Sequence, residues 1–250
     1  MKKMIWLVIG GLLLAGLAAV AAAQSDDAVA KLDSYWATRT GSIATAKQML
    51  AVAEAAFAEK PSFDLAWRAS RIAFWICDRN EDPKIDQEFG KKGWDWGTKA
   101  IGLMPNRVEG YYFGCISLGE YAKGSGIMKA ITGGLGGKYE ELGNKAIALN
   151  EGFDFAGPLR AMGAYYQNLP KLLRKLDKAE QMYLRSEKLA PCKTRTRFYL
   201  VQVYSEMGKW DQVRAKAAAA LAEPGCANDD WETNYYKEEI KKLQAKFPAK

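Results

Sequence analysis

The chain has 250 residues, a formal net charge of +7 and no histidine. Without histidine, a Ser-His or Cys-His nucleophile and an imidazole metal site are both excluded. The acidic residues are scattered and the basic ones are spread along the chain, so we expect no enzymatic activity, no cofactor, no metal and no nucleic-acid binding.

Residues 1–23 have the composition of a secretory signal peptide. Lys2 and Lys3 precede an unbroken apolar run over 4–20, and Ala21-Ala22-Ala23 follows it. The run is short, polar sequence follows at once, and small residues suit cleavage. We therefore predict cleavage after Ala23, one domain over 24–250, and a soluble periplasmic or secreted protein. An uncleaved N-terminal anchor is the alternative, and no cysteine lies there to carry a lipid.

Apolar residues in the rest of the chain recur at intervals of three and four. The stretches 43–60 and 176–190 show this spacing clearly, and alternating strand patterns are absent. This pattern predicts an all-α fold.

A recurring stop signal divides the helices into units. A small residue stands five positions before each stop, in the pairs Ala56 and Pro61, Ala100 and Pro105, Ala146 and Glu151, Ser186 and Pro191, and Ala220 and Gly225. The small residue lets the next helix approach, and proline or glycine lets the chain reverse. We predict a TPR-like (tetratricopeptide-like) helix-hairpin solenoid of about five helix pairs.

The last unit, 194–227, fits the 34-residue TPR pattern best. It has Leu200, Tyr204, Gly208, Trp210 and Ala220 at the usual packing positions. Val213 and Ala217 replace the more common alanine and aromatic residue.

The stretch 124–147 is rich in glycine, but it does not fit a phosphate-binding loop. Thr132 stands where the first glycine of that motif belongs, and Tyr139 replaces the magnesium-binding hydroxyl after Gly137-Lys138. We predict an enlarged turn between helices over about 108–122 and 138–149. A mobile lid over a groove is the alternative.

The first helix of each unit is expected to line the concave side of the solenoid. Taking Ser70, Gly114, Gly163 and Val201 as equivalent positions, the residues that would face the groove are Trp67, Arg71, Phe74, Tyr111, Arg160, Gln167, Phe198 and Gln202. Aromatic rings with two guanidiniums suit a peptide or an anionic amphiphile. The alternative is that the aromatics form the core between repeats and the arginines face solvent. The same register places Tyr166 and Tyr204 on the packing face.

Four cysteines in an exported chain suggest disulfides, and their spacing excludes a zinc site. Cys192 and Cys226 are 34 residues apart, which is one TPR period, so we predict that they are bonded. Cys77 and Cys115 are out of register and are predicted to be buried thiols, unless a shifted helix pairs them.

Three stretches carry a family resemblance: "YYFGCISLGEYAKGSGIMKAI", "KYEELGNKAIALNEGFDFAGPLRAMGAYYQNLP" and "LDKAEQMYLRSEKLAPCKTRTRFYLVQVYSEMGKWDQVRAKAAAAL". Together they resemble the TPR-like T-component (TatT) family of periplasmic proteins, which is associated with tripartite ATP-independent periplasmic (TRAP) transporters. More distantly, the chain is similar to regulator of microtubule dynamics proteins. The typical TatT members are lipoproteins, whereas this chain has no lipobox cysteine.

The resemblance implies a helical scaffold that meets a periplasmic solute-binding protein and contacts an apolar or anionic small ligand, and it allows a homo-oligomer. An envelope assembly scaffold with protein partners and no small ligand is the alternative function. Transporter genes next to the gene for this chain would favour the transporter-associated scaffold.

Overall fold

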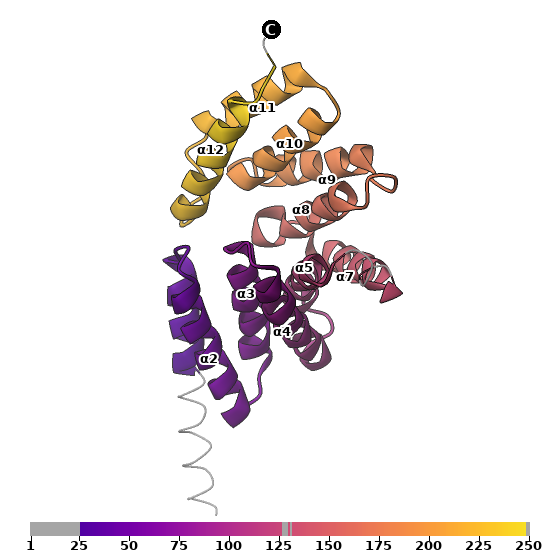
Figure 1. The fold of residues 1–250 in the computed structure, drawn as a ribbon. Helices are drawn as coiled ribbons and strands as arrows, with labels where there is room; N and C mark the ends of the chain where they lie inside the picture. The colour runs from indigo at the N-terminus through magenta and orange to yellow at the C-terminus, as the bar shows by residue number, and fades with distance from the viewer. Residues whose placement is uncertain (1–25, 127–129, 131, 249–250) are drawn as a thin grey trace, which may run out of the picture.

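The computed structural model describes residues 26–126, 130 and 132–248, and over these residues the chain is helical with no strand (Figure 1). A helical segment over 26–37 is followed by α2 (Ile43–Glu59), α3 (Phe63–Asp78), α4 (Pro83–Leu103), α5 (Val108–Ser125), α7 (Leu135–Asn150), α8 (Phe153–Asn168), α9 (Leu176–Leu189), α10 (Thr194–Glu206), α11 (Trp210–Ala222) and α12 (Asp230–Gln244). The predicted signal segment, 1–23, lies outside the described residues.

Local sequence determines where several helices begin. The Ser42 and Ser62 hydroxyls accept hydrogen bonds from the backbone N–H groups of Thr45 and Leu65, which caps α2 and α3. Asp82 caps α4 in the same way, and Pro83 occupies the first turn, where its missing N–H does no harm. The helices predicted from periodicity therefore begin and end close to the expected residues.

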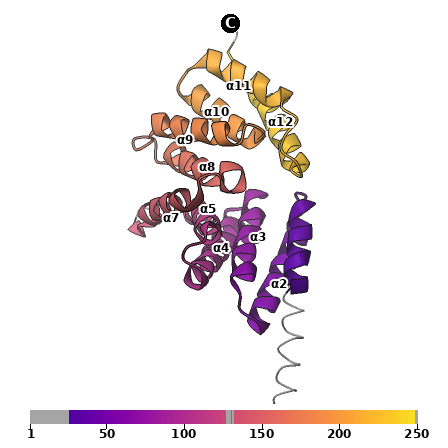
Figure 2. The same cartoon turned by 180° about the vertical axis from the view of Figure 1, so that it is seen from behind.

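The helices stack as successive antiparallel pairs, as the repeat pattern predicts. The segment 26–37 runs alongside α2 (Figure 1), α3 contacts α4, α5 contacts α7, α8 contacts α9 and α10 contacts α11, and α12 packs on α10 and α11 at the end. The first helices of the pairs also contact one another in the series α3, α5, α8, α10 and α12. They form the inner layer of a curved solenoid, which Figure 2 shows from behind.

The α4–α5 crossing depends on glycine. A Cβ on Gly97 would lie 2.4 Å from the Cα of Gly114, which is backbone and cannot move aside. Gly114 on α5 therefore packs against α4, a helix of the preceding pair. Ser70 on α3 instead packs within its own pair, because its hydroxyl donates to the carbonyl of Gly93 on α4 (2.7 Å). The four positions taken as equivalent from the sequence therefore do not all face the same neighbour.

Gly97→Ala should lower the free energy of unfolding by about 1–3 kcal/mol, because the added methyl group separates α4 from α5. Gly102→Ala on the same helix is the control. Nothing lies within 4 Å of its added Cβ, so helix propensity should leave it neutral or slightly stabilised, by up to about 1 kcal/mol. Urea unfolding followed by circular dichroism measures both. Equal effects of the two changes would contradict the close approach.

The two ends of the solenoid meet through side chains. The indole of Trp75 on α3 lies edge-on between Trp36 and Trp231, with ring centroids 5.6 Å from each. Arg39 binds Asp229 (3.0 Å) and Glu232 (3.3 Å), which are 190 or more residues away in the chain. In both views the start of α12 lies end to end with the N-terminal helices (Figures 1 and 2), and these side-chain contacts close the solenoid into a ring.

Candidate functional site

A cavity of about 770 Å³ lies on the inner layer, between α3, α5, α7, α8 and α10. Its aromatic lining is Phe74, Tyr112, Tyr139, Tyr165 and Tyr199. Its aliphatic lining is Ile116, Leu118, Leu135, Ala161, Leu169 and Leu173, among others. This size and lining are typical of sites for small apolar molecules.

The tyrosine hydroxyls of the wall are fixed by the protein. Tyr112 donates to Asp154 (2.9 Å), and Tyr139 donates to the carbonyl of Ala161 (3.1 Å). The rings of Tyr139 and Tyr165 stack with centroids 5.1 Å apart. The wall is therefore formed by ring faces and edges held in one arrangement.

Arg195 brings a positive charge to the cavity from α10. Its guanidinium binds Asp78 on α3 (2.6 Å), and its Nε donates to the hydroxyl of Tyr199 (2.8 Å). Burial alone would lower the pKa of Arg195, but Asp78 and neighbouring groups outweigh it and hold this pKa well above its ordinary value. Arg195 is therefore charged at every physiological pH.

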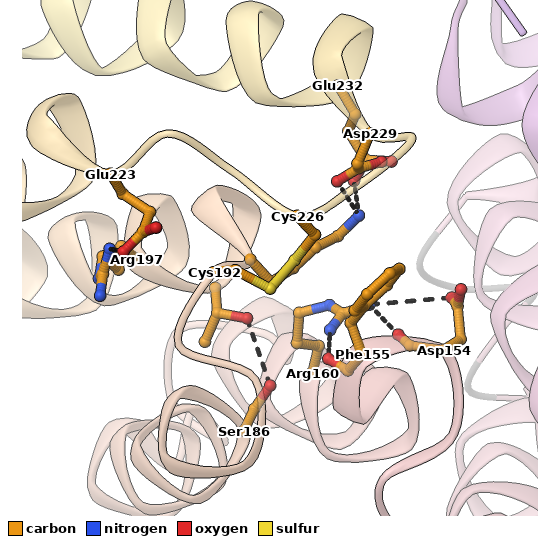
Figure 3. The surroundings of a disulfide bond; sticks show 12 residues. Asp154, Phe155, Arg160, Ser186, Cys192, Arg197, Glu223, Cys226, Asp229 and Glu232 are labelled. Atoms are coloured by element: carbon orange, nitrogen blue, oxygen red, sulfur yellow. Dashed lines mark hydrogen bonds and ion pairs between the residues drawn. A yellow bond between two sulfur atoms is a disulfide. The ribbon is translucent and has the colours of Figure 1, made fainter. Parts of the chain in front are cut away.

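Arg160 brings a second positive charge, and it holds an unusual backbone. At the start of α8, Asp154, Phe155 and Ala156 have φ values of 49°, 54° and 59°, a left-handed conformation that is unfavourable for residues with a Cβ. The Arg160 guanidinium donates to the carbonyls of Asp154 (2.9 Å) and Phe155 (Figure 3). The arginine stabilises this turn from within, and Gly157 next to it lines the cavity.

Two further charged residues face the cavity from α5. Burial raises the pKa of Glu120, although Lys123 beside it opposes that effect. Lys123 also binds Asp86 (3.0 Å). The charged lining residues are thus Arg160, Arg195 and Lys123 with Glu120, and Asp78 and Asp86 outside the lining pair with Arg195 and Lys123.

The ring closure beside the cavity contains a cluster of buried charges, which we call the closure cluster. Lys193 binds Asp229 (2.6 Å) and Glu232 (3.1 Å), and Arg39 binds the same two carboxylates. The cluster is defined by Arg39, Asp78, Arg79, Lys193, Arg195, Asp229 and Glu232. It joins the first and last helices of the ring.

A disulfide lies next to the closure cluster (Figure 3). Cys192 and Cys226 are bonded, with their Cα atoms 4.9 Å apart, as the repeat length predicted. Cys77 and Cys115 are unpaired and buried, also as predicted, and burial raises the pKa of both thiols.

The residues predicted to line a groove divide into two sets. Phe74 and Arg160 line the cavity. Trp67, Arg71, Gln167 and Phe198 are buried elsewhere, and Tyr111 and Gln202 are half-buried. Arg71 lies between the rings of Trp36 and Trp67 and binds Asp33 (3.1 Å), so it faces neither the cavity nor solvent.

The other buried members of the set are also held by the chain itself. Gln167 donates to Glu206 (2.8 Å) and accepts from the hydroxyl of Tyr183 (2.9 Å). The Phe198 ring packs on Tyr236, with centroids 5.0 Å apart. Trp67 stacks on Phe113 (5.8 Å), so these aromatics have the core role that the alternative interpretation gave them.

Sequence reasoning missed most of the cavity lining, including Tyr112, Tyr199 and Arg195. Tyr112 and Tyr199 each follow a predicted residue by one position, a rotation of about 100° around a helix axis. Tyr166 and Tyr204, expected on the packing face, are buried in the core.

The glycine-rich stretch contributes to the cavity wall. Gly134, Gly136 and Gly137 line it, and α7 begins at Leu135, where Gly134 has a φ of 65°. The predicted turn lies where expected, although residues 127–129 and 131 of the proposed lid lie outside the described part of the chain.

The described residues contain no group of three or more Cys, Asp and Glu side chains that could hold a metal ion. No helix there is both long and apolar enough to cross a bilayer.

These features define a class: a TPR-like helical-repeat protein whose inner layer encloses a ligand-sized cavity. No family model and no curated protein matches the chain. The fold is similar to that of TTC0263, a thermophilic TPR protein of Thermus thermophilus, at 17% identity, with a TM-score of 0.65 over 88% of this chain and 100% of that one. Yeast Tom70 is matched at 11% identity and a TM-score of 0.34, over 88% of this chain and 59% of Tom70.

Proposed function

We propose that this protein is a non-enzymatic binding scaffold that holds an apolar carboxylate, such as a long-chain fatty acid, in the cavity of its closed ring. The observation that carries the proposal is a cavity of about 770 Å³ with an aromatic wall that two guanidiniums, those of Arg160 and Arg195, also line. The apolar tail would pack on the tyrosine rings, and the guanidiniums of Arg160 and Arg195 would attract the carboxylate.

The TPR-like fold also supports a role in protein–protein interaction. Stacked helix pairs present extended surfaces, and such repeats serve as scaffolds for partner proteins. We propose that the partner is a periplasmic solute receptor of a TRAP transporter, and that the chain reaches it after removal of residues 1–23. The support for this finer proposal is the sequence resemblance and the composition of the N-terminal segment.

Gly137→Phe should weaken ligand binding by about tenfold or more while leaving the fold intact. Gly137 lines the cavity, and nothing lies within 4 Å of a Cβ added to it, so a phenylalanine side chain fits at this edge of the cavity without a clash at its Cβ. Filling the space removes the contacts that an apolar tail would make. The measurement is titration with a fluorescent polyene fatty acid, beside a thermal melt.

Gly102→Phe is the matched control, since its added Cβ is equally free and it is not part of the cavity lining. The corresponding polyene alcohol should bind more weakly than the acid, because it lacks the charge that the arginines attract. No binding of either probe, together with no lipid recovered by solvent extraction of native protein, would refute the ligand and favour the envelope assembly scaffold.

A further inference from the structure

The loop between α8 and α9, residues 169–175, exposes two adjacent leucines, and we call it the leucine loop. Leu172 is 97% exposed and Leu173 is 57% exposed, more than any other large apolar side chain that the structure describes. Apolar surface in contact with water is unfavourable. Two neighbouring leucines at a loop tip therefore point to an external partner.

The leucine loop is held by hydrogen bonds within it and to the neighbouring helices α8 and α10. They run from Leu173 N–H to the carbonyl of Pro170 (2.7 Å), from Lys175 N–H to the carbonyl of Tyr166 (3.1 Å), and from Arg174 to the carbonyl of Leu169 (3.1 Å) and to Glu206 (2.7 Å). The hydrogen-bonded conformation of the loop thus directs the Leu172 side chain into solvent.

Basic side chains surround the two leucines. Lys171, Arg174 and Lys175 lie in the leucine loop, and Lys178 lies in the first turns of α9, all of them exposed. The nearby acids are Asp177 and Glu206, and Glu206 binds Arg174. Four positive charges against two negative ones leave a local excess of two around the apolar tip.

We propose that the leucine loop docks on a bilayer surface that carries anionic lipid headgroups. Leu172 and Leu173 would enter the interface, and the lysines would remain at the level of the headgroup phosphates. A lipid surface fits better than a protein, because one loop of seven residues is far smaller than a standard protein interface of about 20–30 residues a side.

The position of the leucine loop gives docking a consequence for the cavity. Leu169, Pro170 and Leu173 belong to both the loop and the cavity lining. Docking would therefore bring one lip of the cavity to the membrane surface, where an amphiphile could pass between bilayer and protein. The docking itself does not require that the cavity bind a ligand.

The first test is vesicle flotation of the purified full chain. The protein should float with phosphatidylcholine vesicles that contain about one third phosphatidylglycerol, and much less with phosphatidylcholine alone. Leu172→Asp should lower the partition coefficient about tenfold or more. Leu103→Asp is the matched control, because Leu103 is 45% exposed and lies at the end of α4.

The second test separates charge from apolar contact. Lys171→Glu should weaken partitioning about fivefold or more. Lys145→Glu makes the same change of net charge at an exposed position on α7 and should have little effect.

The third test follows insertion directly. Leu172→Cys can be labelled with an environment-sensitive fluorophore, since Cys77 and Cys115 are buried and Cys192 and Cys226 are bonded. The label should shift to the blue on anionic vesicles, whereas a label at Leu103→Cys should not. Failure of the native chain to float, or equal loss from Leu172→Asp and Leu103→Asp, would overturn the proposal even if the fatty-acid titration succeeds.

Discussion

Lys193→Met should lower the free energy of unfolding by about 3–5 kcal/mol. Lys193 is 4% exposed and binds both Asp229 and Glu232, which are also buried. Methionine has a similar volume and no charge, so the change leaves two buried carboxylates with fewer cations. Urea unfolding at neutral pH measures the loss.

The size of this loss should depend on pH. Burial raises the pKa of Asp229, Glu232 adds to this effect, and Lys193 opposes it. Without Lys193 the pKa of Asp229 should rise further. A falling pH would then protonate this carboxyl and remove the free-energy cost of burying its charge without the lysine. The difference between Lys193→Met and the native chain should therefore shrink from pH 7 to about pH 5.

Lys241→Met is the control for this experiment. Its ion pair with Glu238 has the same chemistry at 2.7 Å, but both side chains are more than half exposed. Exposed pairs contribute about 0–1 kcal/mol. If Lys193→Met lowered the free energy of unfolding by a similarly small amount at every pH, the closure cluster would not stabilise the closed ring.

The second large effect should come from removing the disulfide. The double variant Cys192→Ser and Cys226→Ser should lose about 3–4 kcal/mol, which the entropy model gives for a loop of this length. The bond spans 34 residues and adjoins the closure cluster. Lys193 follows Cys192 directly, and Asp229 lies three residues after Cys226, so the bond also keeps the two charged partners close.

A reducing agent provides the matched comparison. Reduction of the native protein should lower its melting temperature to about that of the double variant, and the double variant itself should not respond. Cys77→Ser should leave the response to reduction unchanged, because that thiol is unpaired. A native melting temperature that reduction does not alter would contradict a stabilising role for this bond.

Much of the fold could be predicted because helix stops are local signals. The pattern gave a helix over 43–60, which the structure places at Ile43–Glu59, and one over 176–190, which is observed at Leu176–Leu189. The disulfide followed from the repeat length, since equivalent positions in adjacent repeats are near neighbours.

The cavity could be predicted only in part because it depends on the rotation of each helix. Of the predicted groove residues, Phe74 and Arg160 line the cavity, whereas on α5 and α10 it is Tyr112 and Tyr199, the neighbours of Tyr111 and Phe198, that line it. The close approach of Gly97 to Gly114 sets the rotation of α5, and it involves two different helix pairs. A register taken from one residue per helix does not include that contact.

The ring closure could not be read from the sequence at all. Asp229 and Glu232 look like ordinary acids at the start of α12, where a helix dipole favours them. Their partner Arg39 is 190 residues from Asp229. Whether they meet depends on the accumulated twist of every intervening repeat, which no local pattern determines.

Closure has a kinetic consequence. In an open solenoid each repeat can form on its neighbour, with contacts that are close in the sequence. The contacts of Arg39 with Asp229 and of Trp75 with Trp231 join distant parts of the chain, so they form after the repeats between them are in place. Interactions that form late slow unfolding and scarcely affect the folding rate. The closed ring therefore slows unfolding and lengthens the lifetime of the folded protein. Without closure, the repeats at either end could unfold first.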